Sequence, residues 1–158
     1  LLGARTLRYV GFDILQPSVA WCRENLAPLA GGRFEFHHVD GHSEHYNPSG
    51  RLAPREIRFP CADDSIDLAF GASLFTHLLE ADALHYLAET SRVLRPGGRA
   101  LYSILPSSSP DAPYRGGEDR IEVAPAYFLG LAARAGLALE ESLGELAGQE
   151  TFLLRTRP

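Results

Sequence analysis

Short runs of apolar residues alternate along the chain with stretches of helical periodicity. The runs at 7–14, 33–39, 66–72 and 99–105 have the length and the branched or aromatic content that strands favour. Between them, apolar residues fall along one side of a helix, at Val19, Cys22, Leu26 and Leu29, and again at Leu84, Leu87, Ala88 and Leu94. This alternation predicts an α/β fold with a Rossmann-like, mostly parallel sheet and flanking helices, one from Pro17 to Gly31 and one near 80–94.

The C-terminal third predicts one more helix and an antiparallel hairpin. The helix spans 125–135 with Gly136 after its end, and the two strands span 137–143 and 150–156. Two polar segments rich in proline and glycine, 42–60 and 106–120, show little periodicity and are predicted to be long loops. A chain of 158 residues is long enough for one core, so we expect a single domain over 1–158.

The composition of the chain limits the kinds of binding partner and chemistry that we expect. The net charge is −5 with no basic stripe, and no apolar run approaches the roughly 18 residues of a membrane span, so we expect neither nucleic acid nor a membrane as partner. Cys22 and Cys61 form no C-x-x-C pair, which favours a reducing, cytoplasmic setting. All 15 basic residues are arginine, which excludes lysine-based chemistry within this chain. Nothing in the sequence indicates a particular oligomeric state.

Acidic and small residues stand where the predicted parallel strands end. Asp13 ends the first strand, Asp40-Gly41 follow the second, and Gly71-Ala72-Ser73 end the third. In open parallel sheets ligands bind at the carboxyl ends of the strands, and a carboxylate there can accept hydrogen bonds from ribose hydroxyls. Simpler interpretations stay open: Asp13 as a helix cap, Asp40 as the start of a turn and Gly71 as a packing glycine.

The order of these features resembles a known family. From Tyr9 to Ile104 the chain is similar to the class I S-adenosylmethionine-dependent methyltransferases of the small-molecule type. The most specific stretch is 59–104, in which a strand opens on Asp67 and leads through small residues to His77, a helix, RVLRPGG and another strand. The family's first strand and its glycine-rich loop have no counterpart in residues 1–8, LLGARTLR, so we expect an N-terminally truncated chain.

The resemblance implies S-adenosyl-L-methionine as cofactor and a small-molecule methyl acceptor. Asp13 would bind the ribose with Ile14 against adenine, Asp40 would accept from the adenine amino group beside Gly41, and the methionine moiety would lie along the backbone of Gly71, Ala72 and Ser73. The transfer would be an in-line displacement, which needs alignment and sometimes removal of a proton.

His77, which the resemblance places on the substrate side, is the candidate base, because an unperturbed imidazole titrates at about pH 6.5. The alternative is that His77 begins the next helix and bonds only locally. His37, His38, His42 and His45 lack the cysteine spacing of a zinc site, so no metal is expected.

Substrate choice is expected in the two long loops, which carry residues able to reach an acceptor: Tyr46, Asn47, Arg51, Arg55, Tyr114, Arg115 and Glu118. Two other functions stay open. One is a degenerate methyltransferase-like binding module, and the other is a nicotinamide-dependent oxidoreductase, in which Asp13 would hold the ribose of a different cofactor.

Overall fold

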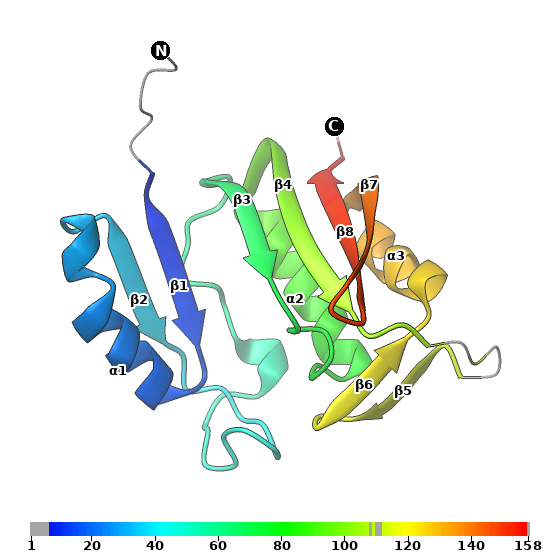
Figure 1. Ribbon diagram of the computed structural model, residues 1–158, viewed down its shortest axis with the longest axis horizontal. Coiled ribbons are helices and arrows are strands. Elements are labelled where there is room, and N and C mark those ends of the chain that lie inside the picture. The colour runs from blue at the N-terminus through cyan, green and yellow to red at the C-terminus, as the bar shows by residue number, and fades with distance from the viewer. Residues whose placement is uncertain (1–6, 108, 110–111, 158) are drawn as a thin grey trace. The chain divides into compact units, whose positions relative to one another are not determined.

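The computed structural model describes residues 7–107, 109 and 112–157, and the chain divides into two compact units, 1–60 and 61–158. Each unit is built around a sheet of its own, and Figure 1 shows their elements. The expectation of a single domain over 1–158 stays a prediction.

The first unit is a β-α-β arrangement. Strands β1 (Tyr9–Asp13) and β2 (Phe34–His38) pair in parallel, with helix α1 (Gln16–Asn25) between them in the chain. The helix ends well before Gly31, because Pro28 has no N–H for an interior helical bond, and a 3-10 turn, η1 (Pro28–Ala30), follows. Leu29, expected on the apolar face, is 82% exposed, so that part of the prediction is wrong.

The predicted first loop is an ordered segment that folds back on the end of β2. The carbonyl of Asp40 accepts from the backbone N–H groups of Arg51 and Leu52, both at 3.0 Å, and His42 N–H donates to the carbonyl of Leu52 at 2.7 Å. A 3-10 turn, η2 (Pro54–Glu56), leads to Ile57 and Phe59, which are buried. Residues 42–60 therefore supply part of the first unit's small core.

The second unit holds a four-stranded sheet in the order β3-β4-β8-β7, formed by β3 (Ile66–Gly71), β4 (Leu94–Ile104), β7 (Leu137–Leu146) and β8 (Gln149–Thr156). β3 and β4 are parallel, whereas β8 is antiparallel to both β4 and β7. The sheet is mixed, so the expectation of a mostly parallel sheet is wrong. The expected C-terminal hairpin is present, and its two-residue turn, Ala147-Gly148, has φ angles of 52° and 78°, which bring β8 back beside β7.

Helices α2 (Glu80–Val93) and α3 (Pro125–Arg134) lie on the same face of this sheet (Figure 1). Leu87 and Phe128 are fully buried there against Tyr102 and Phe152 from the strands. The predicted stripe of α2 is only partly right, because Ala88 is exposed. None of the described helices is long and apolar enough to cross a bilayer.

The RVLRPGG motif forms the entry to β4. The helix ends at Val93 and the strand begins at Leu94, so RPGG is a bulge inside β4 rather than a separate turn, with Ile66 opposite Leu94 and Leu68 opposite Arg99. Gly97 has a positive φ, 78°, which glycine adopts readily.

The second predicted loop contains a hairpin that the sequence analysis missed. Strands β5 (Tyr114–Gly117) and β6 (Arg120–Val123) pair antiparallel, so the loop prediction is wrong over 114–120. Four-residue strands with two glycines give almost no β signal, although Ile121 and Val123 alternate with polar residues and are buried. Residues 108, 110 and 111 of this loop lie outside the described residues.

Candidate active site

The predicted cofactor residues fall into two sets, one on each unit. Asp13, Ile14, Asp40 and Gly41 follow the ends of β1 and β2, and Gly71–Ser73 with His77 follow the end of β3. We call these the acid set and the turn set.

Asp13 is exposed at the end of β1. One carboxylate oxygen accepts from the N–H of Leu15 at 2.8 Å, and Leu15 is the N-cap of α1 without any side-chain cap bond. Asp13 therefore stabilises the turn into the helix rather than capping the helix itself. Its other carboxylate oxygen has no hydrogen-bond partner among the described residues, which fits a ribose hydroxyl.

Ile14 and Gly41 are brought together by packing. A Cβ atom added to Gly41 would lie 2.8 Å from Cγ2 of Ile14 and 2.5 Å from Cδ1 of Ile57. A side chain at position 41 would require both isoleucine side chains to shift, so glycine is the residue that fits the observed packing. The ends of β1 and β2 are thereby closed around one small apolar contact next to Asp13 and Asp40.

Asp40 has a charged partner that the sequence did not assign to it. Nε of Arg51 donates to Oδ2 of Asp40 at 2.6 Å, and the arginine side chain is 86% exposed. The hydrogen bond from Arg51 lowers the pKa of the Asp40 carboxyl. A carboxylate offers about four lone-pair sites, so hydrogen bonds from Arg51 and Asn47 leave capacity for an adenine amino group.

Ser73 lies at the centre of a hydrogen-bonded network. Its N–H donates to Oγ of Ser103 at 3.1 Å, its hydroxyl accepts from Nε2 of Gln149, and its carbonyl accepts from Oγ1 of Thr76 at 2.6 Å. The backbone groups of Ser73 are thus used within the protein. Ala72, which is exposed, is the residue of this segment best able to present its backbone to a ligand.

His77 is half-buried in the turn before α2, and it does not begin that helix. Its Nδ1 lies 2.8 Å from the carbonyl oxygen of Glu118. A carbonyl only accepts, so Nδ1 carries the proton of the neutral ring and Nε2 is the basic nitrogen. The bond is long-range, which contradicts the interpretation that His77 bonds only locally.

The β5–β6 hairpin holds this turn. Besides the His77 bond, Ile121 N–H donates to the carbonyl of Thr76 at 2.8 Å, and the hydroxyl of Tyr114 donates to the carbonyl of Leu78 at 2.5 Å. The phenol of Tyr114 is largely buried, and burial raises its pKa. The sequence analysis listed Tyr114 and Glu118 among the residues able to reach a methyl acceptor. In the structure they position the turn that carries His77.

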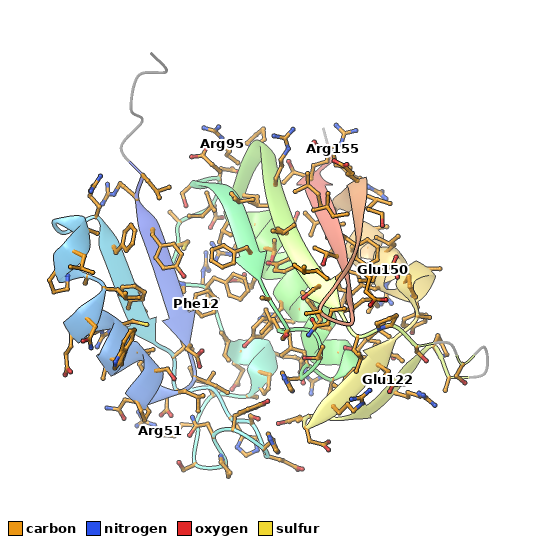
Figure 2. All side chains as sticks on the ribbon, in the orientation of Figure 1. Phe12, Arg51, Arg95, Glu122, Glu150 and Arg155 are labelled. Atoms are coloured by element: carbon orange, nitrogen blue, oxygen red, sulfur yellow. The ribbon has the colours of Figure 1, made fainter. Side chains whose placement is uncertain are left out.

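The charged loop residues pair with neighbours. Nε of Arg115 donates to Glu122 at 2.9 Å, and Arg120 bonds the other carboxylate oxygen of Glu122. Asn47 donates to the carbonyl of Gly41 at 2.9 Å. In Figure 2, the label Arg51 marks the Asp40–Arg51 pair of the first unit. The label Glu122 marks the cluster that Glu122 forms with Arg115 and Arg120 in the second unit.

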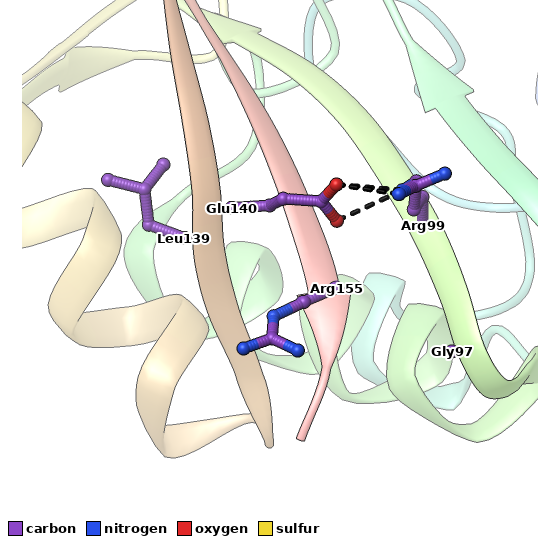
Figure 3. Close-up of a pocket in the computed structure, with 5 residues that line it drawn as sticks. All are labelled: Gly97, Arg99, Leu139, Glu140 and Arg155. Carbon is purple, nitrogen blue, oxygen red and sulfur yellow. Dashed lines mark hydrogen bonds and ion pairs between the residues drawn. The ribbon is translucent and has the colours of Figure 1, made fainter. Parts of the chain in front are cut away.

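One cavity of the structure lies beside Asp13, and another is lined by residues that belong to neither set. A pocket of about 140 Å³ beside Asp13, lined also by Ser18, Cys22 and Phe36, is smaller than the roughly 300 Å³ of typical ligand sites. A larger one, about 460 Å³, lies near the start of β4, where Arg99 binds Glu140 with three hydrogen bonds and Arg155 is adjacent (Figure 3). Its end of the sheet is opposite to the end of β3 that carries the turn set, so we do not assign it to the cofactor. Over the described part of the chain, no three His, Cys, Asp or Glu side chains gather as metal ligands.

The known family that matches this chain is described as a methyltransferase domain, and the match spans residues 1–102. The chain belongs to this family. Membership confirms the resemblance to S-adenosylmethionine-dependent methyltransferases, and it gives the nicotinamide oxidoreductase alternative no support.

Solved structures share the fold of this methyltransferase domain. The 1,6-didemethyltoxoflavin-N1-methyltransferase of Burkholderia thailandensis, solved with 1,6-didemethyltoxoflavin and S-adenosylhomocysteine, matches with a TM-score of 0.68 at 21% identity over 96% of this chain. The pyocyanin biosynthetic protein PhzM matches at 0.65 and 14% identity over 99%. This chain spans only 62% and 52% of those two proteins. The [4+2]-cyclase SpnF matches at 0.64 and 13% identity, over 97% of this chain and 67% of its own.

Proposed function

We propose that this chain takes part in S-adenosylmethionine-dependent methyl transfer to a small-molecule acceptor. The observation that carries the proposal is the exposed Asp13 carboxylate at the end of β1, with a free acceptor oxygen beside the Ile14–Gly41 contact, in a chain of the methyltransferase domain family. Bound S-adenosylmethionine supplies a methyl group on a sulfonium, which is already activated for displacement.

The acid set suits the adenosine end of that cofactor. Asp13 accepts from the ribose hydroxyls, Asp40 accepts from the adenine amino group while it stays bound to Arg51, and Ile14 offers an apolar surface. The turn set suits the methionine end, with Ala72 presenting its backbone. Orientation of donor and acceptor is the main contribution required of the protein.

His77 is proposed to remove a proton from acceptors that lose one. With Nδ1 bound to the carbonyl of Glu118, Nε2 is the nitrogen that takes the proton, and the resulting imidazolium keeps its bond to that carbonyl. The β5–β6 hairpin therefore sets both the tautomer and the direction of the ring.

A second candidate is cofactor binding without methyl transfer. SpnF shares the fold and is named as a cyclase, so the fold alone does not dictate transfer. Production of S-adenosylhomocysteine separates the two candidates.

The test is incubation with methyl-labelled S-adenosylmethionine and a panel of small heterocyclic acceptors that includes 1,6-didemethyltoxoflavin. We expect acceptor-dependent formation of S-adenosylhomocysteine and of labelled product. His77→Gln should lower kcat by about a hundredfold, the lower end of general-base effects, with little change in KM for the cofactor. His85→Gln, on α2, is the matched control. Cofactor binding without product for any acceptor favours the second candidate, and absence of binding contradicts both.

A further inference from the structure

Ser73 adopts a backbone conformation that a serine seldom takes. Its φ is 55°, in the left-handed region, where a Cβ atom crowds the following carbonyl. Such a residue persists where its surroundings hold it, and these residues gather at functional sites. The neighbouring groups of Ser73 therefore reveal what fixes the turn after β3.

A closed ring of hydrogen bonds surrounds Ser73. Ser73 N–H donates to Oγ of Ser103, the Ser103 hydroxyl donates to Oε1 of Gln149 at 2.7 Å, and Nε2 of Gln149 donates back to Oγ of Ser73 at 2.5 Å. Every donor in the ring has an acceptor, which also fixes the orientation of the Gln149 amide. All three side chains are partly buried.

Gln149 reaches this ring because of the C-terminal hairpin. It is the first residue of β8, directly after the Ala147-Gly148 turn, and β8 pairs with β4 so that Ser103 stands opposite Thr151. The rigid pairing places the Gln149 side chain beside the end of β3, 76 residues earlier in the chain. Figure 1 shows the turn between β7 and β8 at the same end of the sheet as the end of β3.

We propose that Gln149 is a positioning residue for cofactor binding: it holds Ser73 in the left-handed conformation and thereby orients the exposed Ala72 toward the methionine end of the cofactor. The inference rests on the proposed function. It makes the C-terminal hairpin, which lies outside the family match over 1–102, a working part of the cofactor site.

Three variants isolate the contact. Gln149→Ala removes the ring. Gln149→Leu keeps a side chain of similar size and loses the hydrogen bonds to both Ser73 and Ser103. Glu150→Gln, at the next position of the same strand, is the matched control. The measurements are the Kd of S-adenosylhomocysteine by calorimetry, KM and kcat for the cofactor, and hydrogen exchange of the Ser73 amide in the free protein.

We expect Gln149→Ala and Gln149→Leu to raise the Kd and the KM for the cofactor by about tenfold, the effect of losing one or two hydrogen bonds. At saturating cofactor, kcat should stay within about twofold, a split that a general loss of structure would not produce. Exchange of the Ser73 amide should accelerate, and Glu150→Gln should resemble the unmodified chain.

A double substitution tests whether Gln149 acts through Ser73. Glycine takes a positive φ readily, so in a Ser73→Gly background the addition of Gln149→Ala should change Kd by less than about twofold. A full additive effect, an unchanged Kd in Gln149→Ala, or an equal loss in Glu150→Gln would each overturn the inference. If the unmodified chain binds no S-adenosylhomocysteine, the proposed function fails, and the positioning of the cofactor fails with it. Exchange at Ser73 then shows separately whether Gln149 holds the turn.

Discussion

The acid set and the turn set are held in place by different means. The acid set is carried by two strands and one helix, and its charged groups, Asp13 and the Asp40–Arg51 pair, face solvent. The turn set stands on the core of a four-stranded sheet, with Phe75 buried between Ser73 and His77 in the chain. Exposed charges adapt to a ligand, whereas the hydrogen-bonded turn after β3 is oriented in advance.

The same contrast explains how each set uses its polar groups. In the acid set a carboxylate oxygen of Asp13 has no partner among the described residues. In the turn set the backbone of Ser73 and Nδ1 of His77 are bonded within the protein, leaving Nε2 of His77 as the basic atom. The acid set therefore offers hydrogen-bond acceptors to a ligand, whereas internal hydrogen bonds fix the orientation of the turn set. Substitutions on each side should therefore differ in what they disturb.

The largest expected effect is on the core beneath the turn set. Phe75 is 1% exposed and meets Tyr102 and Phe128 with ring centroids 4.9 Å away in each case. Phe75→Ala should lower the free energy of unfolding by about 3–5 kcal/mol, measured by denaturant titration. Leu146→Ala, at a side chain that is 74% exposed, should change it by less than about 0.5 kcal/mol. Equal effects would show that the turn set does not depend on a packed core.

Next in size is the close packing beside the acid set. A Cβ at position 41 meets both Ile14 and Ile57, so Gly41→Ala should cost about 1–3 kcal/mol. Gly130→Ala, where the added Cβ meets nothing within 4 Å on the exposed side of α3, should instead stabilise by about 0.5–1 kcal/mol. Thermal melting of both variants checks the sign of each change. If Gly41→Ala were neutral, the acid set would be looser than the contacts indicate.

A smaller effect is expected from the hydroxyl of Tyr102, which donates to Oγ1 of Thr90 at 2.6 Å while Thr90 donates to the carbonyl of Tyr86. Tyr102→Phe should cost about 1 kcal/mol near neutral pH. Burial raises the pKa of Tyr102 to about 12. The unfolded chain therefore loses this proton first, and stability from this group should fall as pH rises from about 10 to about 12. Tyr102→Phe should remove that part of the alkaline decline in unfolding titrations.

The smallest effect should come from the exposed pair in the acid set. Arg51→Ala should raise the pKa of the Asp40 carboxyl toward its ordinary value, because the hydrogen bond from Arg51 holds that pKa down. The stability that this group contributes is present above the ordinary pKa of aspartate and is lost as pH falls through the lowered one. NMR titration of the Asp40 carboxyl measures the shift, with Arg157→Ala as control. An unchanged pKa would show that the pair does not persist in solution.

The sequence predicted what regular periodicity and strong turn residues encode. All six predicted strands exist, and Gly136 follows the end of α3 as predicted. The mixed sheet was missed because strand order depends on which edge the final hairpin joins, and no local pattern reports that. The β5–β6 hairpin was missed because its short, glycine-containing strands derive their stability from contacts with the His77 turn.

For the candidate site too, local patterns identify some residues, whereas others are identified only by tertiary contacts. Asp13, Asp40 and His77 could be named as candidates because acids and small residues at strand ends, and the family resemblance, mark them in the sequence. Arg51 as the partner of Asp40, and Ser103 and Gln149 as partners of Ser73, were not found. Their sequence separations are 11, 30 and 76 residues, and only tertiary pairing joins them.

The most direct test of the account is calorimetric titration of S-adenosylhomocysteine into the unmodified chain and into Asp13→Asn. We predict that the unmodified chain binds and that the variant binds at least tenfold more weakly, since hydrogen bonds to a charged group contribute about 1.5–3 kcal/mol. Equal affinity in the two proteins, or no binding to the unmodified chain, would contradict the proposal that the end of β1 holds the cofactor.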